Sequence, residues 1–124
     1  MRLYVDGMNV IGTRPDGWWR DRHAAMVRLV DLLERWAATS GDDITVVFER
    51  RPDPPISSPV IEVAHAPRPQ PDAADDEIVR RVRAESPRAT VCVVTSDRWL
   101  ADQVRAAGAV VEPADAFRSR IDAG

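Results

Sequence analysis

Four aspartates occupy positions at which a parallel sheet would gather them into one place. Asp6 closes the first apolar run of the chain, and Asp97 closes a later run that is rich in valine. Asp75 and Asp76 open a segment with helical periodicity. Acidic residues at the carboxyl ends of separate parallel strands converge on one crevice, where their charges repel one another unless a cation or a bound proton relieves them. The pattern therefore points to a divalent metal ion and to phosphodiester chemistry.

The spacing of apolar residues predicts the elements that would hold these acids. Short runs rich in β-branched residues indicate strands at residues 2–6, 44–49, 60–64, 90–95 and 109–111. Apolar residues three or four positions apart indicate helices at residues 21–38, 72–85 and 114–121, with a further helix between Asp97 and Gly108. Asp6-Gly7 is expected to form a turn, residues 13–19 a loop, and the proline-rich flanks of residues 60–64 an edge strand.

Strands and helices that alternate in this way form a mostly parallel sheet with helices on both faces. We therefore expect residues 1–124 to form a single α/β domain, a three-layer doubly wound fold with about five strands. Asp6, Glu49 and Asp97 would then lie at one edge of the sheet, and Asp75 would project towards the core-facing side of its helix. A purely structural role is the alternative for one aspartate taken alone, because Asp75 or Asp97 could simply cap a helix.

The composition narrows the class of protein. A chain of 124 residues is long enough for a domain with its own core, and no stretch approaches the roughly 20 apolar residues that a membrane-spanning helix needs. The first strand begins at once, which leaves no room for a signal peptide, and Cys92 is the only cysteine, so we expect a cytoplasmic protein. All 17 basic residues are arginine. The net charge of −3 argues against a protein coated in basic surface, but it is compatible with a local arginine rim.

Three motifs, in this order, resemble those of a known family. Residues 6–12 (Asp-Gly-Met-Asn-Val-Ile-Gly) resemble the Asp-Gly-Tyr-Asn opening of the NYN domains, including the YacP-like proteins, within the PIN-like nuclease superfamily. Residues 74–78 (Ala-Asp-Asp-Glu-Ile) are similar to the Ala-Asp-Asp motif that begins a helix in that family. Residues 93–97 (Val-Val-Thr-Ser-Asp) are similar to its Val-Thr-Ser-Asp strand end. The resemblance spans nearly the entire chain.

This resemblance implies a metal-dependent endoribonuclease with a PIN-like, Rossmannoid fold. It implies Mg²⁺ or Mn²⁺ held by Asp6, Asp76 and Asp97, with Asp75 as a further ligand or a holder of water. Such an ion would activate a water molecule and stabilise charge on the scissile phosphate. Asn9 would donate to phosphate or orient a carboxylate, unless it serves only the turn.

Two positions depart from the family pattern. Many relatives end the second strand in Phe-Asp-Gly, whereas this chain has Phe48-Glu49-Arg50. Glu49 could still reach a metal ion or its water, or Arg50 could neutralise it instead. Met8 replaces the commoner tyrosine, which removes a hydroxyl group and a stacking surface. Neither change removes a predicted metal ligand.

A loop rich in arginine and tryptophan follows the first motif. It supplies Arg14, Trp18, Trp19, Arg20 and Arg22, and Arg50 would extend the same rim. Guanidinium groups bind phosphate and indoles stack on unpaired bases, so this set predicts contact with single-stranded RNA. At least one of the two tryptophans is expected to pack against the core.

Two other functions stay open at this stage. A catalytically weak or inactive PIN-like module that binds RNA or regulates would keep the same fold and rim. A small-molecule phosphohydrolase or a phosphorelay receiver fits less well, because Asp6 begins no Asp-x-Asp pattern and the chain has no lysine. The sequence leaves undetermined the RNA substrate, the number of metal ions, and whether the protein forms a homodimer or has a protein partner.

Overall fold

One sheet of parallel strands runs through the centre of the molecule in the order β3-β2-β1-β4-β5. The computed structural model describes residues 1–87 and 89–124. The strands are β1 (Arg2–Asp6), β2 (Asp43–Phe48), β3 (Glu62–His65), β4 (Val91–Val94) and β5 (Val110–Glu112), and every neighbouring pair is parallel. The central strand β1 pairs on one side with β2 and on the other with β4.

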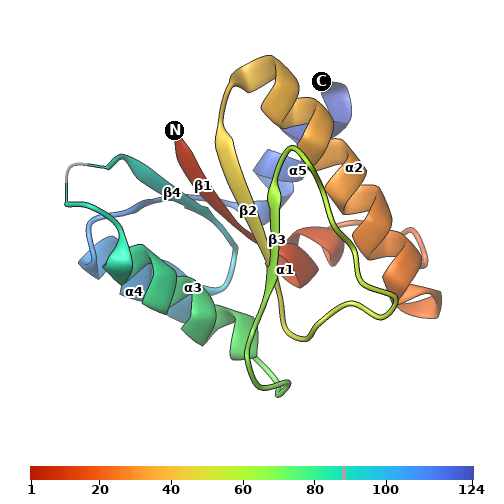
Figure 1. Cartoon of the computed structure of the whole chain (residues 1–124), viewed down its shortest axis with the longest axis horizontal. Helices are drawn as coiled ribbons and strands as arrows, with labels where there is room; N and C mark the ends of the chain where they lie inside the picture. Colours follow the sequence, from red (N-terminus) through yellow and green to blue (C-terminus); the bar gives the residue numbers. More distant parts are fainter. Residues whose placement is uncertain (88) are drawn as a thin grey trace.

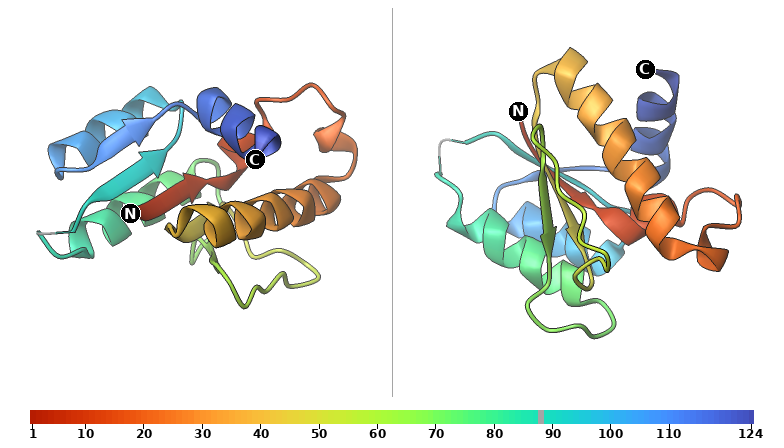
Figure 2. Two further views of the ribbon diagram at one scale, coloured as in Figure 1. Left: turned by 90° about the horizontal axis from the view of Figure 1, so that it is seen from above. Right: turned by 45° about the vertical axis from the view of Figure 1, so that its right-hand side comes forward.

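Helices cover both faces of this sheet, as Figures 1 and 2 show. One face carries α1 (Gly7–Ile11), α2 (Arg22–Ser40) and α5 (Ala114–Ala123), and the other carries α3 (Ala73–Ala84) and α4 (Arg98–Ala106). A short 3-10 turn, η1 (Trp18–Arg20), precedes α2. Successive residues of β1 alternate between the two layers, since Leu3 and Val5 pack in the α2 layer and Tyr4 packs in the α3 layer.

The predicted fold class is confirmed. The observed strands and long helices agree with the predicted ranges to within about two residues at most ends, and the strand flanked by prolines is an edge strand, β3. Glu49 lies one residue beyond the end of β2. In the described part of the chain, no helix is both long and apolar enough to cross a membrane.

The helix α1 is a correction to the prediction of a simple turn at Asp6-Gly7. The chain passes from β1 directly into α1, whose buried residues are Gly7, Val10 and Ile11. A helix of five residues makes fewer than two turns, so it is too short to show a periodic apolar pattern in the sequence. Its position matters because it carries Asn9 back over the end of β1.

Gly7 allows this tight connection, and we expect Gly7→Ala to destabilise the protein by about 1–3 kcal/mol, the usual cost of overpacking a core. A β-carbon at this position would lie 2.5 Å from Cε1 of the fully buried Phe48 and 3.1 Å from Cγ2 of Val46. Helix propensity alone would predict that alanine stabilises the protein by about 1 kcal/mol, so propensity and overpacking act in opposite directions. Urea unfolding measures the difference.

A second variant separates the clash from other effects of the substitution. Phe48→Leu removes the ring that the new β-carbon would meet, so the alanine should cost less in that background than in the wild type. If Gly7→Ala leaves the free energy of unfolding unchanged or raises it, the close packing of α1 on Phe48 is wrong.

Candidate active site

The acids lie at the point where the order of the strands in the sheet reverses. From β1 the chain moves outward through β2 to β3, and it then returns to place β4 on the other side of β1. Ligand sites of open α/β sheets form at such a switch point, outside the carboxyl ends of the strands. Asp6 is the last residue of β1, and Asp97 follows the end of β4.

Two adjoining pockets form an acidic cleft at this edge of the sheet. The inner pocket, about 190 Å³, is lined by Asp6, Met8, Asn9, Glu49, Asp72, Ala74, Asp75 and Asp97. The outer pocket, about 250 Å³, is lined by Pro71, Asp72, Asp75, Asp76, Asp97 and Trp99. Three acids (Asp72, Asp75 and Asp97) border both pockets, so the two pockets lie side by side.

Thr95 connects the two acids that end β1 and follow β4. Its hydroxyl group donates to Oδ2 of Asp6 at 2.9 Å and accepts from the backbone N–H of Asp97 at 3.1 Å. Thr95 is 1% exposed, so both bonds are protected from water. The hydroxyl therefore fixes the orientation of the Asp6 carboxylate relative to the turn that carries Asp97.

Contacts from α1 and α5 to Ser96 hold the same turn in place. The backbone N–H of Ser96 donates to Oδ1 of Asn9 at 2.9 Å, and the backbone N–H of Ala114 donates to the Ser96 hydroxyl at 2.9 Å. Asn9 thus serves the loop with its carbonyl oxygen, and its side-chain N–H groups are its remaining donors in the inner pocket. Ser96 anchors the start of α5.

Asp97 caps a helix and lines the cleft at the same time. Its Oδ1 accepts from the backbone N–H of Leu100 at 2.8 Å, which makes it the N-cap of α4. Capping was the structural alternative for this residue, and it is observed together with the place in the cleft. Asp75 is different, because Asp72 holds the N-cap position of α3 and Asp75 lies in the first turn.

Burial and like charges raise the pKa values of two of these carboxyl groups. The pKa of Asp6 rises to about 6, chiefly because the group is buried, with further contributions from Asp97, Glu49 and Asp72 that the hydrogen bond from Thr95 opposes. The pKa of Asp75 rises to about 7, again chiefly through burial and then through the charges of Asp6, Asp97, Asp72 and Asp76. A cleft with such groups favours a cation or bound protons near neutral pH.

The donor set suits a hard divalent cation. The donors are carboxylate oxygens and one side-chain amide. Mg²⁺ and Mn²⁺ prefer such oxygen ligands to sulfur or imidazole ligands. Within residues 1–87 and 89–124, no three acidic, histidine or cysteine side chains already form a group that could hold an ion. Mg²⁺ commonly binds through one or two carboxylates, with water and substrate phosphate completing its shell, so the residues present fit such an ion.

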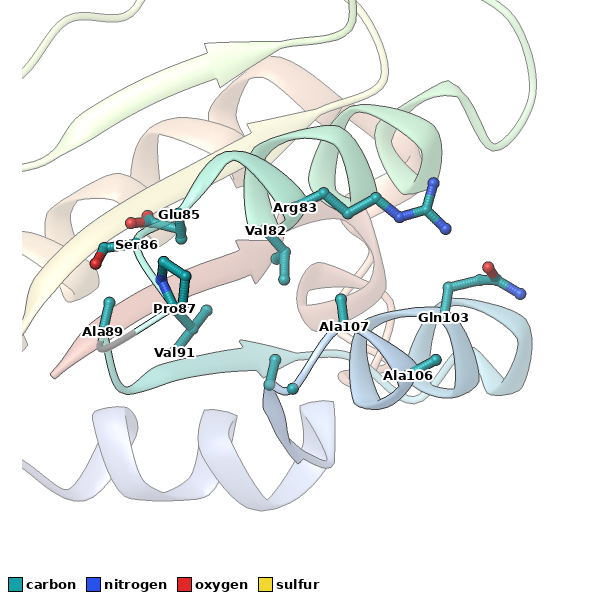
Figure 3. Close-up of a pocket in the computed structure, with 12 residues that line it drawn as sticks. Val82, Arg83, Glu85, Ser86, Pro87, Ala89, Val91, Gln103, Ala106 and Ala107 are labelled. Atoms are coloured by element: carbon teal, nitrogen blue, oxygen red, sulfur yellow. The ribbon is translucent and has the colours of Figure 1, made fainter.

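A larger cavity lies elsewhere, near the carboxyl ends of α3 and α4. It measures about 360 Å³, and Figure 3 shows Val82 and Ala107 beside it, with Arg83 and Gln103 extending from the two helices. Among its described lining residues, the one carboxylate is Glu85, which accepts from Nε of Arg2 at 2.9 Å. This cavity therefore lacks the acid cluster of the cleft.

The sequence matches the profile of the YacP-like NYN domain over residues 3–124. The chain belongs to the YacP-like NYN domain family. The resemblance inferred from the three motifs is thereby confirmed, and it places the protein in the PIN-like nuclease superfamily.

Two solved structures are similar to this YacP-like NYN domain, and both are of Rae1 (YacP) from Bacillus subtilis. One has a TM-score of 0.84 at 21% identity and covers 99% of this chain and 74% of that chain. The other, a tryptophan-to-leucine mutant, has a TM-score of 0.78 at 21% identity, and the match covers 98% of this chain and 75% of the mutant chain. At this identity the likeness shows the common fold alone. No match was found among curated proteins.

The predicted rim of this YacP-like NYN domain divides into exposed and packed side chains. Trp18 is partly buried against the core, which confirms that one tryptophan of the pair packs inward, whereas Trp19 is 52% exposed. The two rings meet edge to face with their centroids 5.9 Å apart. The guanidinium carbon of Arg22 lies 5.3 Å from the Trp18 ring centroid, and that of Arg20 lies 6.0 Å from the Trp19 centroid.

Arg14 and Arg50 differ in their surroundings. Arg14 lies against α5, where its Nε is 3.5 Å from Oδ2 of Asp122 and its Nη2 donates to the Ser119 hydroxyl at 3.0 Å. Arg50 lines a cavity of about 300 Å³ with Arg22, beside the acidic cleft. Glu49 and Arg50 form no ion pair with each other or with another residue in the described part of the chain.

Two residues of the cleft were missed by sequence reasoning. Asp72 borders both pockets and raises the pKa of Asp6 and of Asp75, although the sequence marked it only as the start of a helix. Its φ of 60° is left-handed, a backbone conformation that aspartate tolerates better than most residues. Trp99 lines the outer pocket and is 50% exposed. Its position two residues after Asp97 was the signal that could have identified it.

Proposed function

We propose that this protein is an endoribonuclease that uses Mg²⁺ or Mn²⁺ and hydrolyses phosphodiester bonds of single-stranded RNA. The observation that carries the proposal is the convergence of Asp6, Asp75 and Asp97, from three separate segments, on one cleft at the switch point of the sheet. Membership of a nuclease superfamily supports the reaction class. The exposed indole and guanidinium groups of the rim support the choice of RNA.

In this proposal the residues that border the inner pocket have distinct tasks. Asp6 and Asp97 would hold the metal ion together with the acids at the start of α3, where Asp75 borders the inner pocket and Asp76 the outer one. When bound, the ion supplies an activated water and neutralises charge on the phosphate. Thr95 keeps the Asp6 carboxylate in a fixed orientation.

Two further groups would act on the substrate and on water. The side-chain N–H groups of Asn9 would donate to a phosphate oxygen, since the carbonyl oxygen of that side chain already accepts from Ser96. Asp75, which also borders the inner pocket, would accept a hydrogen bond at its carboxylate from a water molecule in the cleft and so orient that water towards the phosphate.

A non-catalytic module that binds RNA is the second candidate function. One observation favours it: in the part of the chain that the structure describes, the carboxylates are not already grouped around a metal position. The guanidinium groups of Arg22 and Arg50 would serve RNA binding in either case.

Metal dependence separates these candidates, and we expect Mn²⁺ or Mg²⁺ to start RNA hydrolysis and EDTA to stop it. A circular single-stranded RNA is the sharpest substrate, because only an endonuclease can open it. Cleavage by a metal-activated water should leave a 5′-phosphate and a 3′-hydroxyl group. Gel analysis of the opened circle, followed by end labelling with and without phosphatase treatment, measures both properties.

Each contrary outcome has a defined meaning. Hydrolysis that continues unchanged in EDTA would overturn the metal-dependent mechanism. RNA that stays intact with either metal while binding is measurable would instead select the non-catalytic module. Adding excess Mn²⁺ to the EDTA-treated sample provides the control, because activity should return.

A further inference from the structure

We propose that two base-binding subsites flank the acidic cleft: the indole of Trp99 at one end, and a pocket over Met8, Met26 and Phe48 at the other. This inference rests on the proposed function, because it specifies how the same cleft would hold its RNA. It assigns to the substrate one unpaired base on each side of the phosphate that is cleaved.

Trp99 provides the first subsite. It lies in the first turn of α4 and is 50% exposed, whereas its neighbour Leu100 is fully buried in the core. The indole shares the outer pocket with Asp75, Asp76 and Asp97, so a base stacked on it would lie next to a phosphate whose charge a metal ion held by these acids would neutralise. Every nucleobase offers a flat face to an indole, but only an unpaired base can turn that face towards it.

The second subsite is the cavity of about 300 Å³ at the other end of the cleft. Its apolar lining is Met8, Met26 and Phe48, and its polar lining is Arg22, Glu49 and Arg50. Met8 and Glu49 also border the inner pocket, so this cavity adjoins the acidic cleft. Thioether side chains adapt to flat ligands and contact aromatic rings favourably, which suits a base.

The arginines at this end supply positive charge, which the acidic cleft itself lacks. Arg22 and Arg50 are both exposed, and neither forms an ion pair within residues 1–87 and 89–124. The guanidinium carbon of Arg22 lies 5.3 Å from the centroid of the Trp18 ring, which gives this arginine a cation–π contact. A planar guanidinium binds phosphate through two parallel hydrogen bonds, so the next phosphate along the strand would lie here.

The order of groups along the groove matches an extended single strand. An indole, a group of carboxylates and an apolar pocket edged by two arginines follow one another, which suits a base, a phosphate, and then a second base with its next phosphate. A duplex presents paired and stacked bases, which cannot enter either subsite. The substrate class is therefore RNA that is unpaired for at least the two nucleotides around the cleaved bond.

Binding of a fluorescein-labelled pentaribonucleotide, followed by fluorescence anisotropy with Mg²⁺, tests this inference. The Asp6→Asn background keeps the RNA intact, and a gel verifies it. Trp99→Ala should weaken binding about 5- to 150-fold, the range expected for the loss of one stacked base. Trp99→Phe, which keeps a ring, should stay within about 3-fold of the parent. Unchanged binding in Trp99→Ala would overturn the first subsite.

The second subsite is tested through both its charge and its apolar floor. Arg50→Ala should weaken binding and reduce the slope of log affinity against log salt concentration by about 1. Arg83→Ala is the matched control, because Arg83 lines the separate cavity near the carboxyl ends of α3 and α4 and should leave binding within about 2-fold. Equal effects of the two arginine substitutions would overturn the second subsite.

Single abasic nucleotides locate the bases. At one position of the pentamer, an abasic residue should remove the effect of Trp99→Ala, because the stacked base is already absent. At the adjacent position it should remove the effect of Met8→Ala instead. Additive losses at every position would overturn the inference. These measurements need no hydrolysis, so they can succeed even if the wild-type protein fails to cleave RNA, and they can fail while metal-dependent cleavage stands.

Discussion

Asp6→Asn and Asp97→Asn are each expected to reduce metal-dependent RNA hydrolysis by more than 100-fold. Loss of a group that only supports a metal ligand typically lowers metal affinity or activity about 10- to 100-fold, and loss of a proposed direct ligand should lower activity more. Asparagine keeps the shape of the side chain and can still accept the hydrogen bonds that Thr95 and Leu100 donate, so the fold should persist. The charge that holds the cation is what the substitution removes.

Initial rates of RNA cleavage at several Mn²⁺ concentrations measure this effect. Asp102→Asn is the matched control, because Asp102 is exposed on α4 and borders neither pocket of the cleft. The cleavage rate of Thr95→Val should lie between the rates of Asp6→Asn and of the control, since it removes the hydroxyl group that orients Asp6 and leaves every acid in place. Hydrolysis that survives both Asp6→Asn and Asp97→Asn at wild-type rates would eliminate the proposed mechanism.

The same assay compares the two acids at the start of α3. Asp75 is 7% exposed and borders the inner pocket, whereas Asp76 is exposed and borders only the outer one. Asp75→Asn should therefore lower the rate more than Asp76→Asn. The reverse order would support the ligand set that the family resemblance implied, with Asp76 bound directly to the ion.

The positions of the acids along the chain were sufficient to predict their convergence in space. Hydrophobic periodicity is a local property, so it revealed β1, β4 and the start of α3 without knowledge of their partners. The rule that parallel strands present their carboxyl ends to one edge then brought Asp6, Glu49 and Asp97 together. The structure also buries Asp75, as its place on the apolar side of α3 predicted.

Other parts of the site depend on directions that a sequence pattern does not specify. Trp99 is exposed because its neighbour Leu100 takes the core-facing position of α4, and that register is set by packing. Arg14 turns to α5, which follows about a hundred residues later in the chain. The position of the Met8 pocket beside the cleft depends on α1, which is too short to be recognised by periodicity.

The metal-free protein should become less stable between about pH 4 and pH 7 through the ionisation of Asp75 and Asp6. The folded-state pKa of Asp75 is raised from 3.8 to about 7, and that of Asp6 to about 6. Across this window the folded protein keeps protons that the unfolded chain has released, so the stability these groups contribute is lost as pH rises. Above about pH 7 that contribution is gone.

Asp75→Asn should therefore raise the free energy of unfolding at pH 8 in EDTA by about 2 kcal/mol. One pKa unit corresponds to about 1.4 kcal/mol, and the full shift would give about 4 kcal/mol before relaxation of the site and counter-ions reduce it. Near pH 4 the difference from the wild type should nearly vanish, because Asp75 then carries its proton in the folded protein.

Urea unfolding of the wild type and Asp75→Asn, at both pH values, measures this difference directly. Comparing the two proteins at each pH cancels the contribution of the ion-paired acids Glu62, Glu77 and Glu85, whose pKa values are lowered and whose stabilising effect is lost on acidification. Mg²⁺ at pH 8 should then stabilise the wild type more than the variant, because the cation relieves the charge that the asparagine has already removed. A stability difference that is the same at pH 4 and pH 8 would show that the charge of Asp75 does not destabilise the empty cleft.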